Sequence, residues 1–205
     1  CPADKVDGYD GYKSLRLRKD VAEKYKELHA EVQSLGGVIT TAGGRRSLAS
    51  KASPSRSKTS MHYLGRAFDL ALPTGLLNPN KDPYIIERDY DSDNGRKWVV
   101  WCRTDNPDVP VVDLESCYKT SHKNSKGKWY TQLHGKSVTC RAFNFTDLAR
   151  QYGFERISGR RSFFRGGKMT GAEWWHFSYL PGLVKGETTF GSELSRVYSI
   201  KDCES

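Results

Sequence analysis

The sequence lacks a long hydrophobic run. No stretch approaches the ~20 consecutive apolar residues that cross a bilayer, so we expect no transmembrane segment. Hydrophobic residues still make up 37% of the 205 residues, and aromatic residues make up 12%. This composition fits a folded, loop-rich globular protein better than a disordered chain. The length suits one well-formed core, so we expect a single domain over residues 1–205.

Closely spaced cysteine pairs are also missing. The five cysteines, Cys1, Cys102, Cys117, Cys140 and Cys203, form no C-x-x-C motif, which argues against a zinc knuckle or a thioredoxin-type site. We expect at least one disulfide among the last four. The chain begins at Cys1 without a methionine, so we expect that a leading segment has been removed, as in an exported protein. This predicts an extracytoplasmic location in the periplasm, cell wall or medium, with a lipid anchor on Cys1 as one alternative.

The sequence has too few acidic residues to balance its cations. It carries 33 lysines and arginines against 24 aspartates and glutamates, a net charge of +9. Such a surface attracts polyanions, including nucleic acid, anionic lipid and acidic cell-wall polymers. A charge excess alone also keeps many proteins soluble and monomeric. Because no recognisable nucleic-acid motif accompanies the charge, we expect a monomer that does not bind nucleic acid.

Two segments have helical periodicity. The first begins at Asp20 and reads DVAEKYKELHAEVQSLGG, with Asp20 and Glu23 at capping-box spacing and Gly36–Gly37 as the end. His29 lies off its apolar stripe, so we expect it at the surface. The second helix begins at Asn144, which we expect to cap it. The stripe of the first helix comprises Val21, Tyr25, Leu28, Val32 and Leu35.

Strand patterns occupy much of the remaining chain. The run VITTAGGRRS predicts a short strand that breaks at Gly43–Gly44, followed by a Ser/Lys-rich surface loop, LASKASPSRSKTS. Between about residues 73 and 139, four β-rich runs alternate with turn clusters such as DSDNGR and KNSKGK. They predict an inserted, hairpin-rich β segment. His122 and His134 lie in it without nearby ligand-type partners, and we expect both at the surface.

Two short motifs concentrate the chemistry. In TSMHYLGRAFDL, His62 and Asp69 lie seven residues apart on either side of Gly65, which can supply a sharp turn. In GAEWWHFSYL, Glu173 and His176 stand among apolar residues, and alone this motif predicts a buried strand with a structural histidine. Together the motifs supply three ligands typical of catalytic zinc, His62, Asp69 and His176. Glu173 is then a spare carboxylate suited to act as general base.

These motifs resemble the signatures of the zinc D-Ala-D-Ala peptidases, the family of the vancomycin-resistance D,D-carboxypeptidases and D,D-dipeptidases. SMHYLGRAFD is similar to S-x-H-x-x-G-x-A-x-D, and EWWH is similar to E-x-x-H. The resemblance covers Asp20–Leu72 and Ala142–Leu180, and it leaves the segment at 73–139 unmatched. It implies an α+β fold in which a small antiparallel sheet carries a Zn²⁺ site, with helices packed behind the sheet.

The resemblance also implies an activity. It points to hydrolysis of peptide bonds in peptidoglycan stem peptides, with intact peptidoglycan or muropeptides as substrate. Arg46 of GRRS stands where the family has its substrate-contacting arginine, although Arg45 replaces the family's tyrosine. Ser60 is either a hydrogen-bonding residue near the substrate or a loop residue bonded to backbone. Of Trp174 and Trp175, we expect one in the core and one in the pocket wall.

Three alternatives remain open from the sequence. A phage-type lysin that cuts L-Ala-D-Glu bonds would use the same zinc chemistry. Hedgehog-type signalling domains share the fold and a similar zinc motif without catalysis, but the retention of Glu173 favours an enzyme. A basic wall-binding or nucleic-acid-binding module would contain only structural histidines and no stoichiometric zinc.

Overall fold

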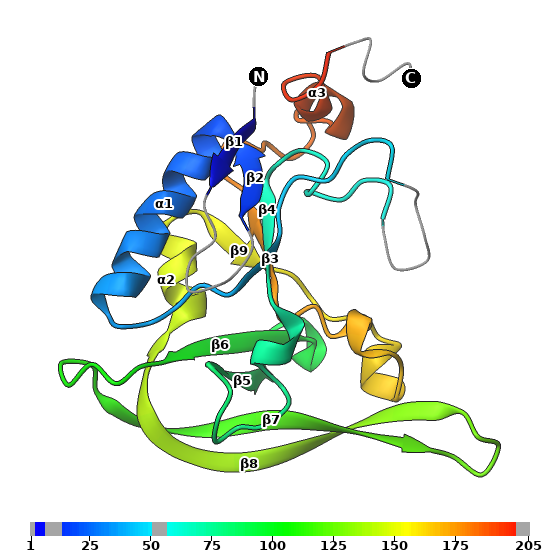
Figure 1. Ribbon diagram of the computed structural model, residues 1–205. Helices are drawn as coiled ribbons and strands as arrows, with labels where there is room; N and C mark the ends of the chain where they lie inside the picture. The colour runs from blue at the N-terminus through cyan, green and yellow to red at the C-terminus, as the bar shows by residue number, and fades with distance from the viewer. Residues whose placement is uncertain (1–2, 7–13, 51–56, 200–205) are drawn as a thin grey trace.

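The computed structural model describes residues 3–6, 14–50 and 57–199. It shows an α+β protein with two four-stranded antiparallel sheets and few helices (Figure 1). A smaller sheet pairs β1 (Ala3–Val6) with β2 (Leu15–Arg18). None of the helices in these ranges combines the length and apolar character needed to cross a bilayer.

The first four-stranded sheet is short and contains two of the predicted metal ligands, Asp69 and His176. Its order is β3-β4-β10-β9, and its strands are β3 (Thr41–Gly43), β4 (Ala67–Leu70), β10 (His176–Tyr179) and β9 (Phe154–Arg156). The helices α1 (Lys19–Ser34) and α2 (Phe145–Gln151) lie on one side of it (Figure 1). The predicted strand before Gly43–Gly44 is therefore present, in a shortened form.

Aromatic side chains join this sheet to the two helices. The ring of Phe68 on β4 lies 5.1 Å from that of Tyr25 on α1, and the ring of Phe177 on β10 lies 5.2 Å from that of Phe145 on α2. All four side chains are fully buried. Burying an aromatic side chain of this size stabilises a fold by roughly 1.5–3 kcal/mol. The helix-facing side of the sheet is therefore the main core.

The second four-stranded sheet is built from the predicted β-rich runs. Its order is β5-β6-β8-β7, and a bridge between Glu87 and Ser116 joins β5 to β7 and closes the sheet on itself. The β7–β8 pair forms a long hairpin whose far end projects away from the sheet (Figure 1). The strands are β5 (Tyr84–Asp89), β6 (Lys97–Arg103), β7 (Val111–Lys123) and β8 (Trp129–Asn144). β8 thus continues beyond the boundary predicted at residue 139.

Short helical turns connect these sheets. The 3-10 helices η1 (Leu72–Thr74) and η2 (Asp93–Gly95) flank β5. The turns η3 (Phe163–Arg165) and η4 (Met169–Gly171) lie between β9 and β10, and α3 (Phe190–Leu194) follows β10.

Two predictions about the first helix are wrong. The helix begins at Lys19, and its N-cap, Arg18, makes no side-chain cap, so the Asp20–Glu23 capping box is not formed. The carboxylate of Asp20 accepts hydrogen bonds from the Arg18 guanidinium instead. His29 is buried, not exposed, because α1 packs against both the small β1–β2 sheet and α2. The buried face is therefore wider than the apolar stripe that the sequence displays.

The predicted cap of the second helix is present. The side chain of Asn144 accepts a hydrogen bond from the backbone N–H of Asp147, which confirms the predicted cap of α2.

The cysteines Cys102, Cys117 and Cys140 are all free thiols, so the predicted disulfide is wrong for these three. Cys1, Cys203 and residues 51–56 of the Ser/Lys-rich loop lie outside the described residues.

Candidate metal centre

Strand alternation places two of the predicted ligands on the face opposite the core. Asp69 and His176 are directly paired residues of β4 and β10. Each follows or precedes a core phenylalanine, Phe68 or Phe177, and successive side chains of a strand point to opposite faces. Packing the phenylalanines against the helices therefore aims the carboxylate and the imidazole together at the other side of the sheet.

The third ligand comes from a tight turn before β4. The backbone N–H of Gly65 donates to the carbonyl of His62 at 3.1 Å, and Gly65 has φ +62°. The Gly65 carbonyl accepts from the backbone N–H of Arg18, and a Cβ at this position would lie 2.7 Å from that nitrogen. Only glycine fits both the dihedral and the close approach. The turn directs His62 toward the strand pair.

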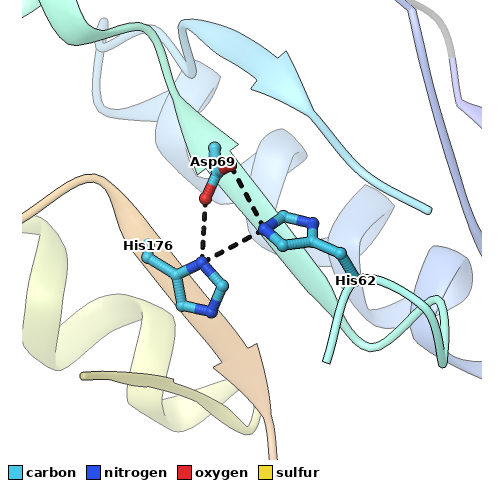
Figure 2. A group of neighbouring side chains, drawn as sticks. All are labelled: His62, Asp69 and His176. Carbon is cyan, nitrogen blue, oxygen red and sulfur yellow. Dashed lines mark hydrogen bonds and ion pairs between the residues drawn. The ribbon is translucent and has the colours of Figure 1, made fainter. Parts of the chain in front are cut away.

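The three side chains converge on one point, as Figure 2 shows. His62 Nε2 lies 3.1 Å from Asp69 Oδ2 and 3.2 Å from His176 Nδ1, and His176 Nδ1 lies 2.9 Å from Asp69 Oδ1. Each residue offers a ligand atom, and these atoms all lie within 4.8 Å of one another. His62, Asp69 and His176 therefore form a group that could hold a metal ion.

Neighbouring groups orient both imidazoles. His62 Nδ1 lies 2.7 Å from the carbonyl oxygen of Gly44; because a carbonyl only accepts, Nδ1 carries a proton and the neutral ring keeps its lone pair on Nε2. His176 Nε2 lies 3.0 Å from Ser178 Oγ, a contact in which the ring can donate and leave its lone pair on Nδ1. Both lone pairs then face the Asp69 carboxylate. Three electron-rich groups this close require a cation among them, either protons or a metal.

The spacing also suits a small metal ion. Zinc–nitrogen and zinc–oxygen distances of about 2.0–2.2 Å in a tetrahedron place neighbouring ligand atoms about 3.3–3.6 Å apart. The contacts between the three side chains, 2.9, 3.1 and 3.2 Å, are slightly shorter, so small side-chain movements are sufficient to admit the ion. Two imidazoles and a carboxylate match the donor set of catalytic zinc sites. Hydrogen bonds to zinc-bound imidazoles, like those to Gly44 and Ser178 here, typically fix the tautomers of the ligands.

The electrostatics of Asp69 agree with this arrangement. Burial alone would raise the pKa of its carboxyl group. When protons are the cations between the three side chains, the imidazoles of His176 and His62 donate hydrogen bonds to Asp69, and these outweigh burial and lower the pKa below its ordinary value. The carboxylate is therefore ionised at neutral pH and is available as an anionic ligand.

The metal-ligand group opens into a cavity of about 440 Å³. Glu173 lines this cavity beside His62, Asp69 and His176, and so do Arg46 and Ser60. All six residues that the sequence singled out are thus brought together at one site. Trp174 is buried in the core while Trp175 also lines the cavity, as expected for this pair.

Glu173 has an unusual backbone and a specific partner. Its φ is +58°, a left-handed conformation that costs a non-glycine residue about 1–3 kcal/mol and often marks functional sites. Its Oε1 accepts from Arg160 Nε at 3.0 Å, and its side chain is 14% exposed. The backbone turn and the arginine together fix the carboxylate at the cavity wall.

Arg46 and Ser60 are connected to the His62 turn. The backbone N–H of Arg46 donates to the His62 carbonyl at 2.9 Å, and its guanidinium lies 5.4 Å from the centroid of the Tyr63 ring. Ser60 Oγ accepts from the backbone N–H of His62 at 3.4 Å. Ser60 therefore has the loop contact that was one of its two expected roles, while it also lines the cavity.

The sequence interpretation missed three contributors. Ser178 could have been found, because it is two residues from His176 in a strand and so shares its face. Gly44 acts through its carbonyl and Arg160 reaches Glu173 from a loop, and neither has a signal in the residue pattern. The chain matches no family model, no curated protein and no solved structure.

Proposed function

We propose that this protein is a zinc-dependent peptidase that hydrolyses peptide bonds of peptidoglycan stem peptides, as a carboxypeptidase of the D-Ala-D-Ala type. The observation that carries the proposal is the convergence of the metal-ligand group and the Glu173 carboxylate on one cavity. The resemblance of the two motifs to the zinc D-Ala-D-Ala peptidase signatures supports the choice of substrate. On this proposal the protein works outside the cytoplasm, where peptidoglycan lies.

The metal-ligand group would hold zinc through His62, Asp69 and His176. Three protein ligands are typical of catalytic zinc, whereas structural zinc usually has four. When bound, zinc supplies Lewis-acid polarisation of the scissile carbonyl and lowers the pKa of a water molecule. The hydrogen bonds to Gly44 and Ser178 keep both imidazoles presented to the ion.

Glu173 transfers the proton from water to the leaving amine during hydrolysis. Its carboxylate accepts a proton from the attacking water and returns it to the departing amine, so one group serves as base and then as acid. Arg160 occupies Oε1 of Glu173, so we assign the proton transfer to Oε2. The arginine thereby orients the carboxylate without taking the proton itself.

Arg46 binds the substrate's terminal carboxylate. A carboxypeptidase must recognise a free α-carboxylate, and an arginine guanidinium does so with paired, charge-assisted hydrogen bonds. Arg46 lines the same cavity as the metal-ligand group, with its guanidinium against the Tyr63 ring. This contact limits the positions of the guanidinium and reduces the entropy lost on binding.

The decisive experiment compares wild type with Glu173→Gln. The variant keeps the size of the side chain and removes its basicity, so we expect bound zinc and an unchanged Tm, with hydrolysis of purified muropeptides reduced by about 10²–10⁴-fold. Glu155→Gln is a matched control, because Glu155 lies on β9 and pairs with Arg150 outside the cavity; it should hydrolyse muropeptides normally.

Other outcomes separate the alternatives. Hydrolysis at the wild-type rate by Glu173→Gln would reject the mechanism. Stoichiometric zinc without any hydrolysis by the wild type would identify a hedgehog-like binding protein, and protein without zinc would identify a module with structural histidines. Mass spectrometry of the fragments distinguishes release of a terminal D-Ala from cleavage of an L-Ala-D-Glu bond.

A further inference from the structure

A second cleft lies beside the far end of the β7–β8 hairpin. It has a volume of about 800 Å³ and is bounded by residues 128–131 of the hairpin and by residues 162–168. The backbone N–H of Thr131 donates to the carbonyl of Gly166 at 3.2 Å, which joins these two walls. The hairpin's far end runs below η3 and η4 in Figure 1. The cleft therefore has two walls that are fastened to each other.

Exposed aromatic side chains line this cleft. Trp129 is 63% exposed and Tyr130 is 39% exposed, although large aromatic side chains usually dominate cores and interfaces. The ammonium of Lys123, the cross-strand partner of Trp129, lies 5.2 Å from its ring centroid. Cross-strand packing accounts for that contact, but it leaves most of the indole uncovered. An exposed indole in a cleft is a stacking platform for a ligand.

The charge of the cleft is of one sign. Lys128, Arg165 and Lys168 line it, and its described lining residues include neither aspartate nor glutamate. Hydroxyl groups of Ser121, Thr131 and Ser162 complete its polar surface. A ligand that matches this chemistry has flat apolar faces, many hydroxyl or amide groups, and negative charge.

One connection contributes residues to both the cleft and the metal cavity. Residues 157–175 connect β9 to β10, and Arg160, Thr170 and Glu173 of this connection line the metal cavity. Arg165 and Lys168 of the same connection line the second cleft. Because both sites use this connection, a polymer held in the cleft can extend toward the metal cavity.

We propose that this cleft binds the glycan strand of intact peptidoglycan and so presents its stem peptides to the metal cavity, an inference that rests on the proposed function. Sugar rings offer apolar faces to Trp129 and hydroxyl groups to the serine and threonine side chains. The carboxylates of neighbouring stem peptides pair with Lys128, Arg165 and Lys168. Single-stranded nucleic acid also combines stacking with negative charge, and it forms the competing outcome of the test.

Binding is measured with the full chain carrying Glu173→Gln, so that the polymer stays intact. The protein is sedimented with purified, insoluble peptidoglycan, alone and in competition with either a single-stranded oligonucleotide or soluble glycan strands. Trp129→Ala should weaken binding at least about fivefold, the loss expected for an aromatic that contributes more than 1 kcal/mol. Lys168→Glu should weaken it as well, through charge and not through stacking.

Tyr90→Ala is the matched control. Tyr90 is a 72% exposed aromatic beside a cation, with the Arg88 guanidinium 4.9 Å from its ring centroid, and it lies outside the cleft. This variant should bind peptidoglycan as the parent does. In the background with an intact Glu173, Trp129→Ala should hydrolyse free stem peptides, which carry no sugar, at the parent rate and intact peptidoglycan more slowly.

The two levels of the proposal fail in different ways. If the wild type cleaves no muropeptide, the proposed function fails, while the sedimentation assay still reports on the cleft. Unchanged sedimentation of both Trp129→Ala and Lys168→Glu would overturn the glycan site even in an active peptidase. Equal losses in Tyr90→Ala, or displacement of the protein from peptidoglycan by the oligonucleotide at lower concentration than by soluble glycan, would also overturn it.

Discussion

Replacing Glu193 by glutamine should destabilise the protein strongly, because this residue neutralises a buried arginine. The Glu193 carboxylate on α3 accepts from Arg66 at 2.7 Å and from Arg18 at 2.6 Å. The Arg66 side chain is fully buried, and its other hydrogen bonds go to the neutral carbonyls of Tyr179 and Pro181. In the described part of the chain, Glu193 is the one carboxylate that pairs with Arg66.

The expected magnitude follows from that burial. Removing one partner of a buried ion pair leaves an uncompensated charge and costs about 3–5 kcal/mol. For a protein of this length, each kcal/mol lowers Tm by roughly 2–4 °C, so Glu193→Gln should lower Tm by about 6–20 °C. Arg18 retains a second carboxylate, Asp20, which is why the loss falls mainly on Arg66.

The assay is thermal unfolding of Glu193→Gln beside a matched variant, Asp20→Asn. The Asp20 side chain is 50% exposed and pairs with the same Arg18, so its removal should cost only about 0–1 kcal/mol. Similar Tm values for the two variants would refute the reasoning, because leaving the buried Arg66 without its carboxylate would then not lower the unfolding free energy more than losing an exposed ion pair does. Because Arg66 belongs to the motif that contains His62 and Asp69, we also expect weaker metal binding in Glu193→Gln.

Four further predictions test the same structure. His62→Ala should remove most of the bound zinc by metal analysis, while His134→Ala, outside the metal cavity, should not; equal occupancy would reject the ligand set. Arg160→Ala should lower kcat by about 10–100-fold, the loss of one charged hydrogen bond of ~1.5–3 kcal/mol, at unchanged zinc content, and Arg160→Lys should restore part of it. Burial raises the pKa of Cys102 to about 12, so its thiol should react with thiol reagents at pH 8 only after unfolding; rapid labelling of the folded protein contradicts this. Burial alone would raise the pKa of Glu193, but hydrogen bonds from Arg18 and Arg196 lower it below 4.5. The difference in unfolding free energy between wild type and Glu193→Gln should therefore be complete above pH 4.5 and shrink as the pH falls through the lowered pKa. A difference that stays constant in acid would contradict this prediction.

Local rules predict two of the three members of the metal-ligand group. His62 and Asp69 are separated by a glycine turn and a strand, so short-range geometry is sufficient to aim both. His176 lies 107 residues after Asp69, and the sequence assigns it through its ligand chemistry and the E-x-x-H signature. The cap of α2 is equally local, since Asn144 acts on an N–H three residues away. Signals of this kind are readable without knowledge of the tertiary structure.

The errors concern contacts between distant segments. His29 is buried by elements that pack against α1 from elsewhere in the chain, and the periodicity of one helix cannot report them. Asp20 pairs with Arg18 because Arg18 is itself held by Glu193 near the end of the chain. The closure of the second sheet by Glu87 and Ser116 likewise depends on strands that pair far apart in sequence.

Phe68 alternates with Asp69 on β4, and His176 alternates with Phe177 on β10. Metal binding therefore reports whether the core residue and the ligand of each strand lie on opposite faces. Inserting a single residue between Phe68 and Asp69 would put the phenyl ring and the carboxylate on the same face of the strand, whereas inserting two would return them to opposite faces. Odd and even insertions should therefore have opposite effects on metal binding, although the even insertion lengthens the chain more. Any transplantation of this centre to another sheet must carry the two phenylalanines with it, because they set the direction in which the ligands point.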